Sequence, residues 1–579
     1  MIVKCPKCGA PNRIPALVEP TKKYLCGKCN SRFDLHQQVS TDRRKDRLRA
    51  KTTAKQNKNS LRIMFDSSVR LPFVHPLLFS IIPILSLYSA NIRQASPSML
   101  LIPTLITVGA LVPFLLLAWV VIRDIYKSAI IASIFSVLFF YYGQALSAFQ
   151  GHSTSTLMPA KWAILLIIWG VLFLVAAYFI ARTRRNLIVS TVVLNAISAV
   201  IFLFIAVTVL LYEVNVDSAD RNAAQNIDNS TLSLPLEEPA RLPNIYYIIL
   251  DRYAGESTLQ DEFSFDNSEF LSYLSDKGFY IASQATSNYI TTEVSLASSL
   301  NMEYLDHLSQ EVPAGFPDLD PIYHMIEHNQ VALLLQSQGY QFLNFGSWWG
   351  TTSQNRYADS NFNYWRVPYF STVLFQQTAA YPIAARLGLF DDWNTRHGKC
   401  ALYTFSTLPE TTPMKGPIFV FAHILMPHLP FVFDSNGTYL SPSEADSRNA
   451  EANYVNQLIY TNSKVETLIN ELLSSSDTPP IIILQADEGP FPKETENAGF
   501  DWRQANEQQL RQKMTILNAY YFPGMDKDAM YPSMTPVNSF RLIFNLYFKA
   551  NFPLLPDKSY VNNIGDRPFD FIDVTNKLH

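Results

Sequence analysis

The chain has 579 residues, of which 48% are hydrophobic and only 16% charged, and its net charge is −3. The charged fraction is low against the roughly 25% of ordinary soluble domains, which indicates that part of the chain lies in lipid. Residues 1–70 hold 17 Lys/Arg against 5 Asp/Glu, residues 71–212 hold 7 against 1, and residues 213–579 hold 22 against 43. The acidic C-terminal part is therefore not expected to bind nucleic acid, whose phosphates require positive charge.

Two Cys-x2-Cys pairs lie near the N-terminus, and 17 residues separate Cys5 and Cys8 from Cys26 and Cys29. This spacing predicts a structural zinc ribbon over residues 1–36, with four thiolate ligands. A redox motif or disulfides are the alternatives, but no βαβ pattern surrounds either pair. The segment CPKCGAPNRIP resembles the small zinc ribbon that precedes some bacterial thioredoxins. The sequence does not identify the role of such a ribbon here; binding of a cytosolic partner is one interpretation.

A basic juxtamembrane segment is predicted over residues 37–70, with nine Lys/Arg between Asp42 and Arg62. A nucleic-acid-binding patch is one interpretation. The position just before a first apolar segment favours a cytoplasmic flank that sets the membrane topology.

Five uncharged apolar segments follow within residues 71–212, each about as long as the 20 residues that cross a bilayer. They are Leu71–Ala90, Met99–Ile122, Ala129–Phe149, Trp162–Ala181 and Leu187–Tyr212. Loops 123–128 and 182–186 carry five Lys/Arg together, whereas loops 91–98 and 150–161 carry one each. The positive-inside rule predicts a multi-pass protein of the plasma (inner) membrane, with its N-terminus cytoplasmic and its C-terminal domain extracellular or periplasmic. Because the segments lack charged residues, we interpret them as an anchor or lipid-access platform rather than a transporter.

Residues 213–242 are predicted to be a linker, and residues 243–579 an outer domain in which strands and helices alternate. The expected strands are Asn244–Leu250, Gly278–Ala282, Tyr340–Phe345, Pro417–Ala422 and Pro480–Ala486. The expected helices are Asn267–Lys277, Thr292–Asn301, Pro321–Ser337 and Ser447–Leu473. This alternation predicts an α/β domain with a mostly parallel sheet.

Polar residues end three of the expected strands. Asp251 follows IYYIIL, His423 follows PIFVFA, and Asp487 with Glu488 follows PIIILQA. Each alone is explained by turn or cap formation. Together they predict a cation site, because ligands gather at the carboxyl ends of parallel strands.

Thr292 stands at the expected start of a helix in SNYITTEVSLASSLN. A cap threonine is the simple interpretation. A helix N-terminus also favours anions, so a hydroxyl there, next to a divalent cation, is a candidate nucleophile for attack on phosphorus.

The ordered set NIYYIILD, SNYITTEVSLASSLN, HILMPHLPFVF and LQADEGP resembles the metal strand, nucleophile helix, histidine segment and second metal strand of the alkaline-phosphatase and sulfatase superfamily. Apolar spans ahead of such a domain resemble its membrane branch, the lipoteichoic-acid synthases and phosphoethanolamine transferases. The resemblance implies metal ligands at Asp251 and Asp487, and a metal-bound nucleophile at Thr292. It also implies contacts from His423 and His428 to the phosphate or leaving group. Arg356, in GSWWGTTSQNRYAD, is a candidate phosphate anchor.

One departure concerns the metal, since the superfamily commonly has Asp-His-Gly where this chain has Asp487, Glu488 and Gly489. With Glu488 as a fourth ligand the set is all oxygen, which favours Mn or Mg, with Ca or Zn as alternatives. A degenerate site without a catalytic metal is the other interpretation.

The expected activity is metal-dependent transfer of a phosphoryl-linked head group, of phosphoglycerol or phosphoethanolamine type, from a membrane phospholipid to a glycan or lipid acceptor. The nucleophile position holds Thr292, whereas sulfatases have Cys or Ser there, so the resemblance favours transfer of a phosphoryl group over transfer of a sulfuryl group. A phosphodiesterase or phosphatase of the same fold and an inactive sulfatase-like binding module are the alternatives.

Overall fold

The computed structural model describes residues 2–5, 7–8, 10–13, 23–34, 71–92, 97–150, 161–230, 242–311, 319–364, 369–389, 393–495, 500–563 and 567–578. The predicted basic segment, residues 37–70, lies outside this description. The chain divides into two compact units. One comprises Met1–Phe79, Pro113–Ser133 and Ala176–Phe202, and the other comprises Ser80–Val112, Ile134–Val175 and Leu203–His579.

The N-terminal ribbon consists of two short antiparallel hairpins. Strand β1 (Ile2–Lys4) pairs with β2 (Pro11–Arg13), and β3 (Lys23–Leu25) pairs with β4 (Arg32–Asp34). A turn with a cysteine pair joins the strands of each hairpin, where Cys5 N–H donates to Ala10 O and Cys26 N–H donates to Ser31 O. The two turns thus present four thiols from two similar loops.

Apolar helices occupy the five segments predicted to span the membrane. They are α2 (Val74–Ala90), α3 (Leu101–Ile122), α4 (Ile125–Phe140), α5 (Tyr142–Gln150), α6 (Lys161–Arg182) and α7 (Ile188–Ser230). Three stretches, Pro97–Ile122, Lys161–Arg182 and Ile188–Val214, are long and apolar enough to cross a membrane. The pair α4 and α5, bent by 47°, makes a fourth if it is one span, whereas α2 has only 17 residues. Length and composition thus support three or four crossings, and five are not confirmed.

Helix α7 also continues beyond the last predicted span, to Ser230. The first part of the predicted linker is therefore helical, and residues 231–241 lie outside the described residues.

The outer domain is built on a seven-stranded mixed sheet with the order β6-β11-β10-β5-β9-β7-β8. Five neighbouring strands are parallel, and β11 and β6 add an antiparallel edge. The strands are β5 (Ile245–Leu250), β6 (Tyr280–Ile281), β7 (Gln341–Phe345), β8 (Ser360–Phe362), β9 (Ile418–Ile424), β10 (Ile481–Gln485) and β11 (Asn518–Tyr521). The alternating pattern therefore predicted the fold class correctly but missed the short strand β8 and the antiparallel β11.

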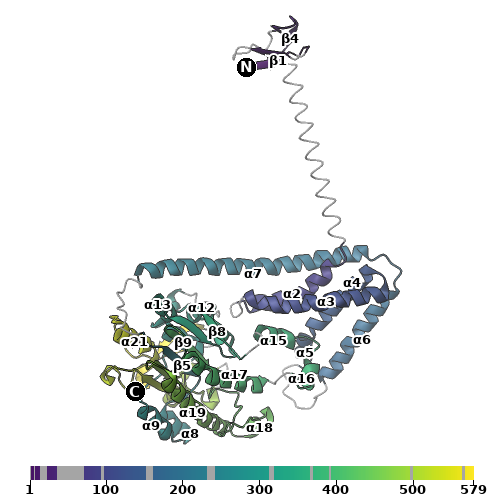
Figure 1. Cartoon of the computed structure of the whole chain (residues 1–579). Helices are drawn as coiled ribbons and strands as arrows, with labels where there is room; N and C mark the ends of the chain where they lie inside the picture. The colour runs from purple at the N-terminus through teal and green to yellow at the C-terminus, as the bar shows by residue number, and fades with distance from the viewer. Residues whose placement is uncertain are drawn as a thin grey trace. The chain divides into compact units, whose positions relative to one another are not determined.

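The central strands β5, β9 and β10 are buried along their whole length, as expected for a sheet covered on both faces. Figure 1 shows β5 and β9 in the middle of the domain, with helices around them. The helices are α8 (Glu256–Phe263), α9 (Ser268–Asp276), α10 (Thr292–Asn301), α11 (Leu308–Glu311), α12 (Asp320–Glu327), α13 (Gln330–Ser337), α14 (Gly350–Ser353), α15 (Tyr369–Gln376), α16 (Tyr381–Arg386), α17 (Trp393–Thr407), α18 (Pro442–Ser447), α19 (Ala450–Ser475), α20 (Glu507–Met514) and α21 (Ser539–Phe548). A small hairpin of β12 (Tyr560–Asn563) and β13 (Arg567–Asp573) follows.

One of the expected helices differs in the structure. The single helix predicted over Pro321–Ser337 is two helices, because α12 ends at Glu327 and Asn329 caps the start of α13: its side chain accepts a hydrogen bond from Ala332 N–H at 2.8 Å. Helix α10, in contrast, begins at Thr292 as predicted.

Candidate metal and nucleophile site

Three of the predicted ligands meet at the carboxyl edge of the sheet. Asp251 directly follows β5, Asp487 lies just beyond β10, and His423 is the penultimate residue of β9 rather than the residue after it. The three strands are neighbours in the sheet, which is why their ends converge. One ligand atom from each of the three residues lies within 4.8 Å of the other two, and all three residues are buried.

Asp251 presents one occupied and one free carboxylate oxygen. Its Oδ2 lies 3.2 Å from His423 Nε2, whereas Oδ1 is buried with no hydrogen-bond partner among the described residues. Burial raises the pKa of Asp251, but the charges of His428 and His423 outweigh it and lower the pKa below its ordinary value. The residue is therefore an ionised carboxylate with an oxygen available to a cation.

Asp487 is the second buried carboxylate. Its Oδ1 accepts a hydrogen bond from Arg252 N–H at 3.2 Å, and Oδ2 has no partner in the described part of the chain. Burial raises the pKa of Asp487 well above its usual range, and the charges of Asp251 and Glu488 raise it further. Two buried carboxylates with unpaired oxygens side by side need either a proton or a cation between them. The arrangement fits a divalent metal.

The His423 ring is held in position by residues that contact its Nδ1 side, away from Asp251. Its Nδ1 lies 2.9 Å from Thr352 Oγ1, which in turn lies 2.7 Å from Ser347 Oγ. Trp349 packs edge-on against the imidazole, with ring centroids 5.9 Å apart. An imidazole that ligates a metal through one nitrogen commonly donates its other N–H to such a partner. The segment around GSWWGTT thus supports the site through Trp349 and Thr352.

Glu488 has a different set of partners from the one predicted. Its Oε1 lies 2.9 Å from Lys513 Nζ and 3.1 Å from Arg252 Nε, while Oε2 is buried and unpartnered among the described residues. Both cations lie over the Phe491 ring. Burial lowers the pKa of Lys513 to about 8, and Glu488 opposes that shift. The structure thus groups His423 with the two aspartates, and gives Glu488 two cationic neighbours, of which Lys513 is fully buried and Arg252 partly exposed.

Thr292 occupies the first turn of α10. Thr291 precedes it in extended conformation, and the helix interior behind it is fully buried. Thr292 itself is half-buried, and its side chain lies close enough to Asp487 to lower the pKa of that carboxyl. The next residue, Glu293, was not predicted; burial, with the charge of Glu488, raises its pKa to about 7. The hydroxyl is therefore next to the carboxylates and at the end of the helix where anions bind.

The two remaining predicted residues lie in different surroundings. His428 is on the loop after β9, where burial lowers its pKa to about 3 and the charge of Asp251 opposes that shift. Arg356 Nε donates to Glu327 Oε1 at 3.0 Å. No described contact brings Arg356 to the aspartates.

A cavity of about 330 Å³ opens beside the centre and is lined by Arg252 and His428. Its rim carries two further cations, Arg448 and Lys493, against one acid, Glu451. Aromatic rings of Phe263, Phe431, Tyr454 and Phe491 form its walls. In a domain with an excess of acidic residues, this cationic rim favours an anionic ligand.

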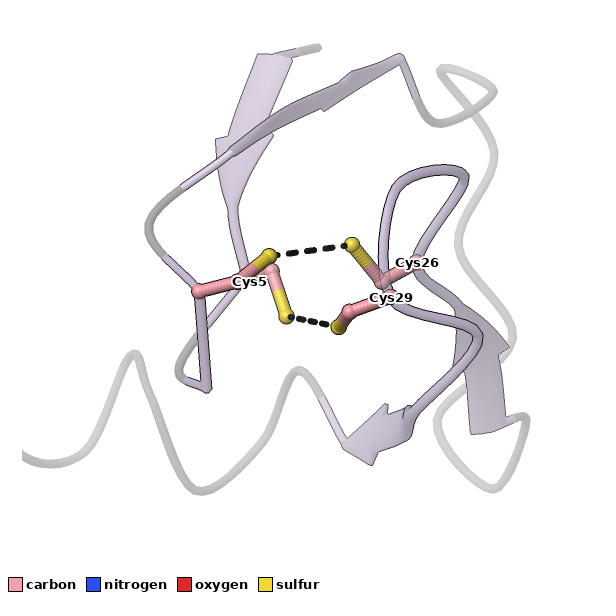
Figure 2. Close-up of side chains that lie close together, drawn as sticks. Cys5, Cys26 and Cys29 are labelled. Atoms are coloured by element: carbon pink, nitrogen blue, oxygen red, sulfur yellow. Dashed lines mark hydrogen bonds between the residues drawn. The ribbon is translucent and has the colours of Figure 1, made fainter.

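The N-terminal cysteines form a separate candidate metal centre. The Sγ atoms of Cys5 and Cys29 are 3.7 Å apart, those of Cys8 and Cys26 are 3.6 Å apart, and all four thiols lie within 4.8 Å of one another (Figure 2). Zn–S bonds of about 2.3 Å in a tetrahedron place sulfurs roughly 3.8 Å apart. Backbone N–H groups of Lys28 and Cys29 lower the pKa of Cys26 to about 6, which favours the thiolate that zinc binds. The cluster fits the predicted zinc ribbon.

Comparison with known proteins agrees with this geometry. The family model described as Sulfatase matches residues 243–541. No curated protein matches the chain.

Solved structures with low identity are also similar. The C-terminal periplasmic domain of EcEptC from Escherichia coli is 13% identical, with a TM-score of 0.37, covering 59% of this chain and 96% of that one. Lipooligosaccharide phosphoethanolamine transferase A (EptA) from Neisseria meningitidis is 14% identical, with a TM-score of 0.35, and the match covers 81% of this chain and 95% of that one. The C-terminal periplasmic domain of phosphoethanolamine transferase EptC from Campylobacter jejuni is 13% identical, with a TM-score of 0.32, and the match covers 55% of this chain and 92% of that one.

The family match spans the strands that deliver Asp251, His423 and Asp487 and the helix that begins at Thr292. The chain belongs to the sulfatase family, in the alkaline-phosphatase superfamily.

Proposed function

We propose that the protein is a membrane-anchored, metal-dependent transferase that moves a phosphoryl-linked phospholipid head group, of phosphoglycerol or phosphoethanolamine type, through a Thr292 nucleophile. The observation that carries this proposal is the position of Thr292. A half-buried hydroxyl at the start of α10 lies beside Asp487, one of two buried carboxylates that each keep an unpaired oxygen.

Asp251, Asp487 and His423, with the Thr292 hydroxyl, would hold one divalent cation. When bound, the cation neutralises the carboxylates and favours the deprotonated hydroxyl. An imidazole in the ligand set suits Zn as well as Mn, whereas an all-oxygen set would favour Mn, Mg or Ca. Glu488 serves as the counter-ion of Lys513 and Arg252 in this arrangement, which removes the main reason to prefer a hard metal.

The chemistry is a double displacement. Thr292 Oγ attacks phosphorus, the bond from phosphorus to the diacylglycerol oxygen breaks, and the proton lost by Thr292 is transferred to the departing oxygen, with His428 in contact with the phosphate or the departing group. An acceptor hydroxyl then attacks the phosphothreonine, the bond from phosphorus to Thr292 Oγ breaks, and the proton of the acceptor hydroxyl returns to Thr292 Oγ. The first N–H groups of α10 hold the phosphoryl oxygens during both steps.

The second substrate decides the class of reaction. A glycan or lipid hydroxyl gives a transferase, and water gives a phosphodiesterase. The cavity lined by Arg252 and His428 offers room for either the head group or the acceptor. Five membrane crossings, with a cytoplasmic N-terminus, would place this cavity outside the plasma membrane with the lipid donor.

The test uses the full chain in vesicles that contain phospholipid labelled in its head group. Thr292→Ala is expected to reduce turnover at least 10³-fold and to abolish a phosphorylated peptide that contains residue 292, seen by mass spectrometry. Thr291→Ala is the matched control, because it removes the neighbouring threonine hydroxyl, which has no described contact with Asp251 or Asp487; it should keep activity within about threefold of the wild type. Full activity of Thr292→Ala, or a phosphoryl adduct on another residue, would refute the nucleophile. Release of the labelled head group in free form would identify a hydrolase, whereas its transfer to an acceptor would identify a transferase.

A further inference from the structure

The segment of helices α15 and α16 is attached to the bend between the membrane helices α4 and α5. Gly143 N–H donates to Gln377 O at 2.7 Å, and Ala379 N–H donates to Phe139 O at 2.9 Å. A Cβ on Gly143 would lie 2.6 Å from Gln377 Cα. Glycine is therefore required at position 143 for the two backbones to approach this closely.

Side chains extend the same contact. Phe370 and Leu374 of α15 belong to one buried apolar cluster with Ile84, Tyr88 and Phe140 of the membrane helices. The rings of Tyr88 and Phe370 meet edge to face, with centroids 6.3 Å apart. An outer-domain helix thus shares a core with helices whose other surfaces are apolar and exposed.

The position of Gly143 along helices α4 and α5 matches the distance across a membrane. Gly143 is 18 residues beyond the start of α4 at Ile125, which at 1.5 Å per residue is at most about 27 Å, close to the thickness of the hydrocarbon core. Tyr141 and Tyr142 stand at this level, and Tyr142 Oη donates to Trp162 O at 2.5 Å. Tyrosine and tryptophan are typical of the boundary between lipid and water.

Apolar side chains are exposed directly after this contact. Ile383 is 45% exposed, and Leu387 and Leu389 are each 67% exposed. Arg386, also exposed, lies between them. Burial of an aliphatic side chain is favourable, so three exposed ones within seven residues indicate a partner.

We propose that residues 381–389 insert into the outer boundary of the lipid bilayer, with Ile383, Leu387 and Leu389 among acyl chains and Arg386 at the lipid phosphates. The occupant of this apolar surface is the bilayer, because the segment is fixed by main-chain hydrogen bonds to a helix pair that itself has the length and composition of a membrane span. A basic residue flanked by aliphatic ones is the composition of an interfacial segment.

The segment also leads to the metal centre. Helix α17 follows it, and His397 of α17 has Nε2 2.9 Å from Leu425 O, two residues after His423. A lipid at residues 381–389 would therefore have its head group on the side of the domain from which α17 reaches the site. The proposal does not depend on the identity of the nucleophile.

The experiment places an environment-sensitive fluorophore (NBD) on Leu387→Cys and, separately, on Leu389→Cys, in the zinc-loaded full chain reconstituted in nanodiscs. Cys400 is 3% exposed and burial raises its pKa to about 12, so it should not compete for the label. Leu554→Cys is the matched control, a leucine of the outer domain that is 39% exposed. Each labelled protein is compared in nanodiscs of ordinary and brominated phosphatidylcholine, and with aqueous iodide.

Brominated lipid should quench the labels at 387 and 389 at least twofold and leave the label at 554 within 10%, while iodide should show the reverse order. Quenching of 387 and 389 by iodide and not by bromine would overturn the proposal. Protection from both quenchers, with crosslinking to a second copy, would also overturn it by identifying a protein partner. Phospholipid turnover by the same samples is measured separately, so loss of activity is not confused with loss of insertion.

Discussion

Thr352 is the residue that orients His423 toward the aspartates. Its hydroxyl lies 2.9 Å from His423 Nδ1 and also contacts Ser347, so the ring is fixed from the side opposite to Asp251. Support of this kind commonly changes metal affinity by 10- to 100-fold.

Thr352→Val should therefore weaken metal binding at the outer-domain centre about 10- to 100-fold, measured by competition with a chelator of known affinity. Thr351→Val is the matched control in the same short helix, α14, because the Thr351 hydroxyl has no hydrogen-bond partner within the described residues. Equal affinities of the two variants would show that the Thr352 contact does not orient the ligand.

Glu488 gives a second prediction at this scale. Glu488→Gln keeps the shape of the side chain but leaves Lys513, which is fully buried, without its counter-charge. Removal of one partner of a buried ion pair costs about 3 to 5 kcal/mol, so the unfolding midpoint of the outer domain in urea should fall while its metal content stays unchanged.

Glu507→Gln serves as the control, because Glu507 pairs with Arg511 at 3.9 Å on an exposed surface; little change is expected. Loss of the metal without loss of stability would instead identify Glu488 as the ligand that the sequence predicted.

At the scale of elements, the packing of the segment after α15 against the bend between α4 and α5 depends on the absence of a side chain at Gly143. Gly143→Ala places a methyl group within 2.6 Å of the Gln377 backbone, which cannot move without breaking the hydrogen bond at Gly143. The thermal midpoint should fall by the equivalent of about 1 to 3 kcal/mol, as for other overpacked sites.

Gly170→Ala in α6 is the matched control, since no described atom lies within 4 Å of its added Cβ. A similar midpoint for both variants, measured by scanning fluorimetry in one detergent, would mean that the backbone contact at Gly143 contributes nothing to stability.

At the scale of the whole molecule, the two candidate metal centres share no residue and belong to different compact units. The wild-type chain should therefore carry two metal equivalents by elemental analysis. Cys26→Ser should lose the ribbon zinc alone, and Asp487→Asn should lose the outer-domain metal alone. Cys400→Ser should change neither content, because that cysteine lies outside both clusters. Loss of both metals from either single ligand variant would contradict this independence.

Some of this organisation could be predicted from local pattern. The runs IYYIIL, IFVFAHI and IIILQ are apolar enough to be strands buried on both faces, and a parallel arrangement brings Asp251, His423 and Asp487 to one edge. Thr292 was recognisable because small and aliphatic residues continue after it as a helix. The cysteine spacing likewise indicates one tetrahedral centre.

Other features were not predictable from local pattern. Lys513 lies in a polar helix whose composition is typical of an exposed surface, yet its side chain is fully buried. The reason is that Glu488 and Phe491 contact Lys513 only in the folded domain. Thr352 contributes through a hydrogen bond to His423, which is 71 positions away in the sequence. Arg252 contributes through its backbone N–H, which donates to Asp487, 235 positions away. No periodicity in the sequence encodes such a contact.

Glu488 shows most clearly the division between what the sequence determines and what the tertiary structure decides. The sequence by itself determined which residues stand at the ends of the central strands and at the start of α10, because burial of apolar runs dictates the strands and hence their ends. Only the tertiary structure decided which of those residues face one another: His423 joined the aspartates, while Glu488 was drawn to Lys513 and Arg252. The reason is electrostatic, since a buried carboxylate and a buried ammonium group from distant segments each lower the cost of burying the other.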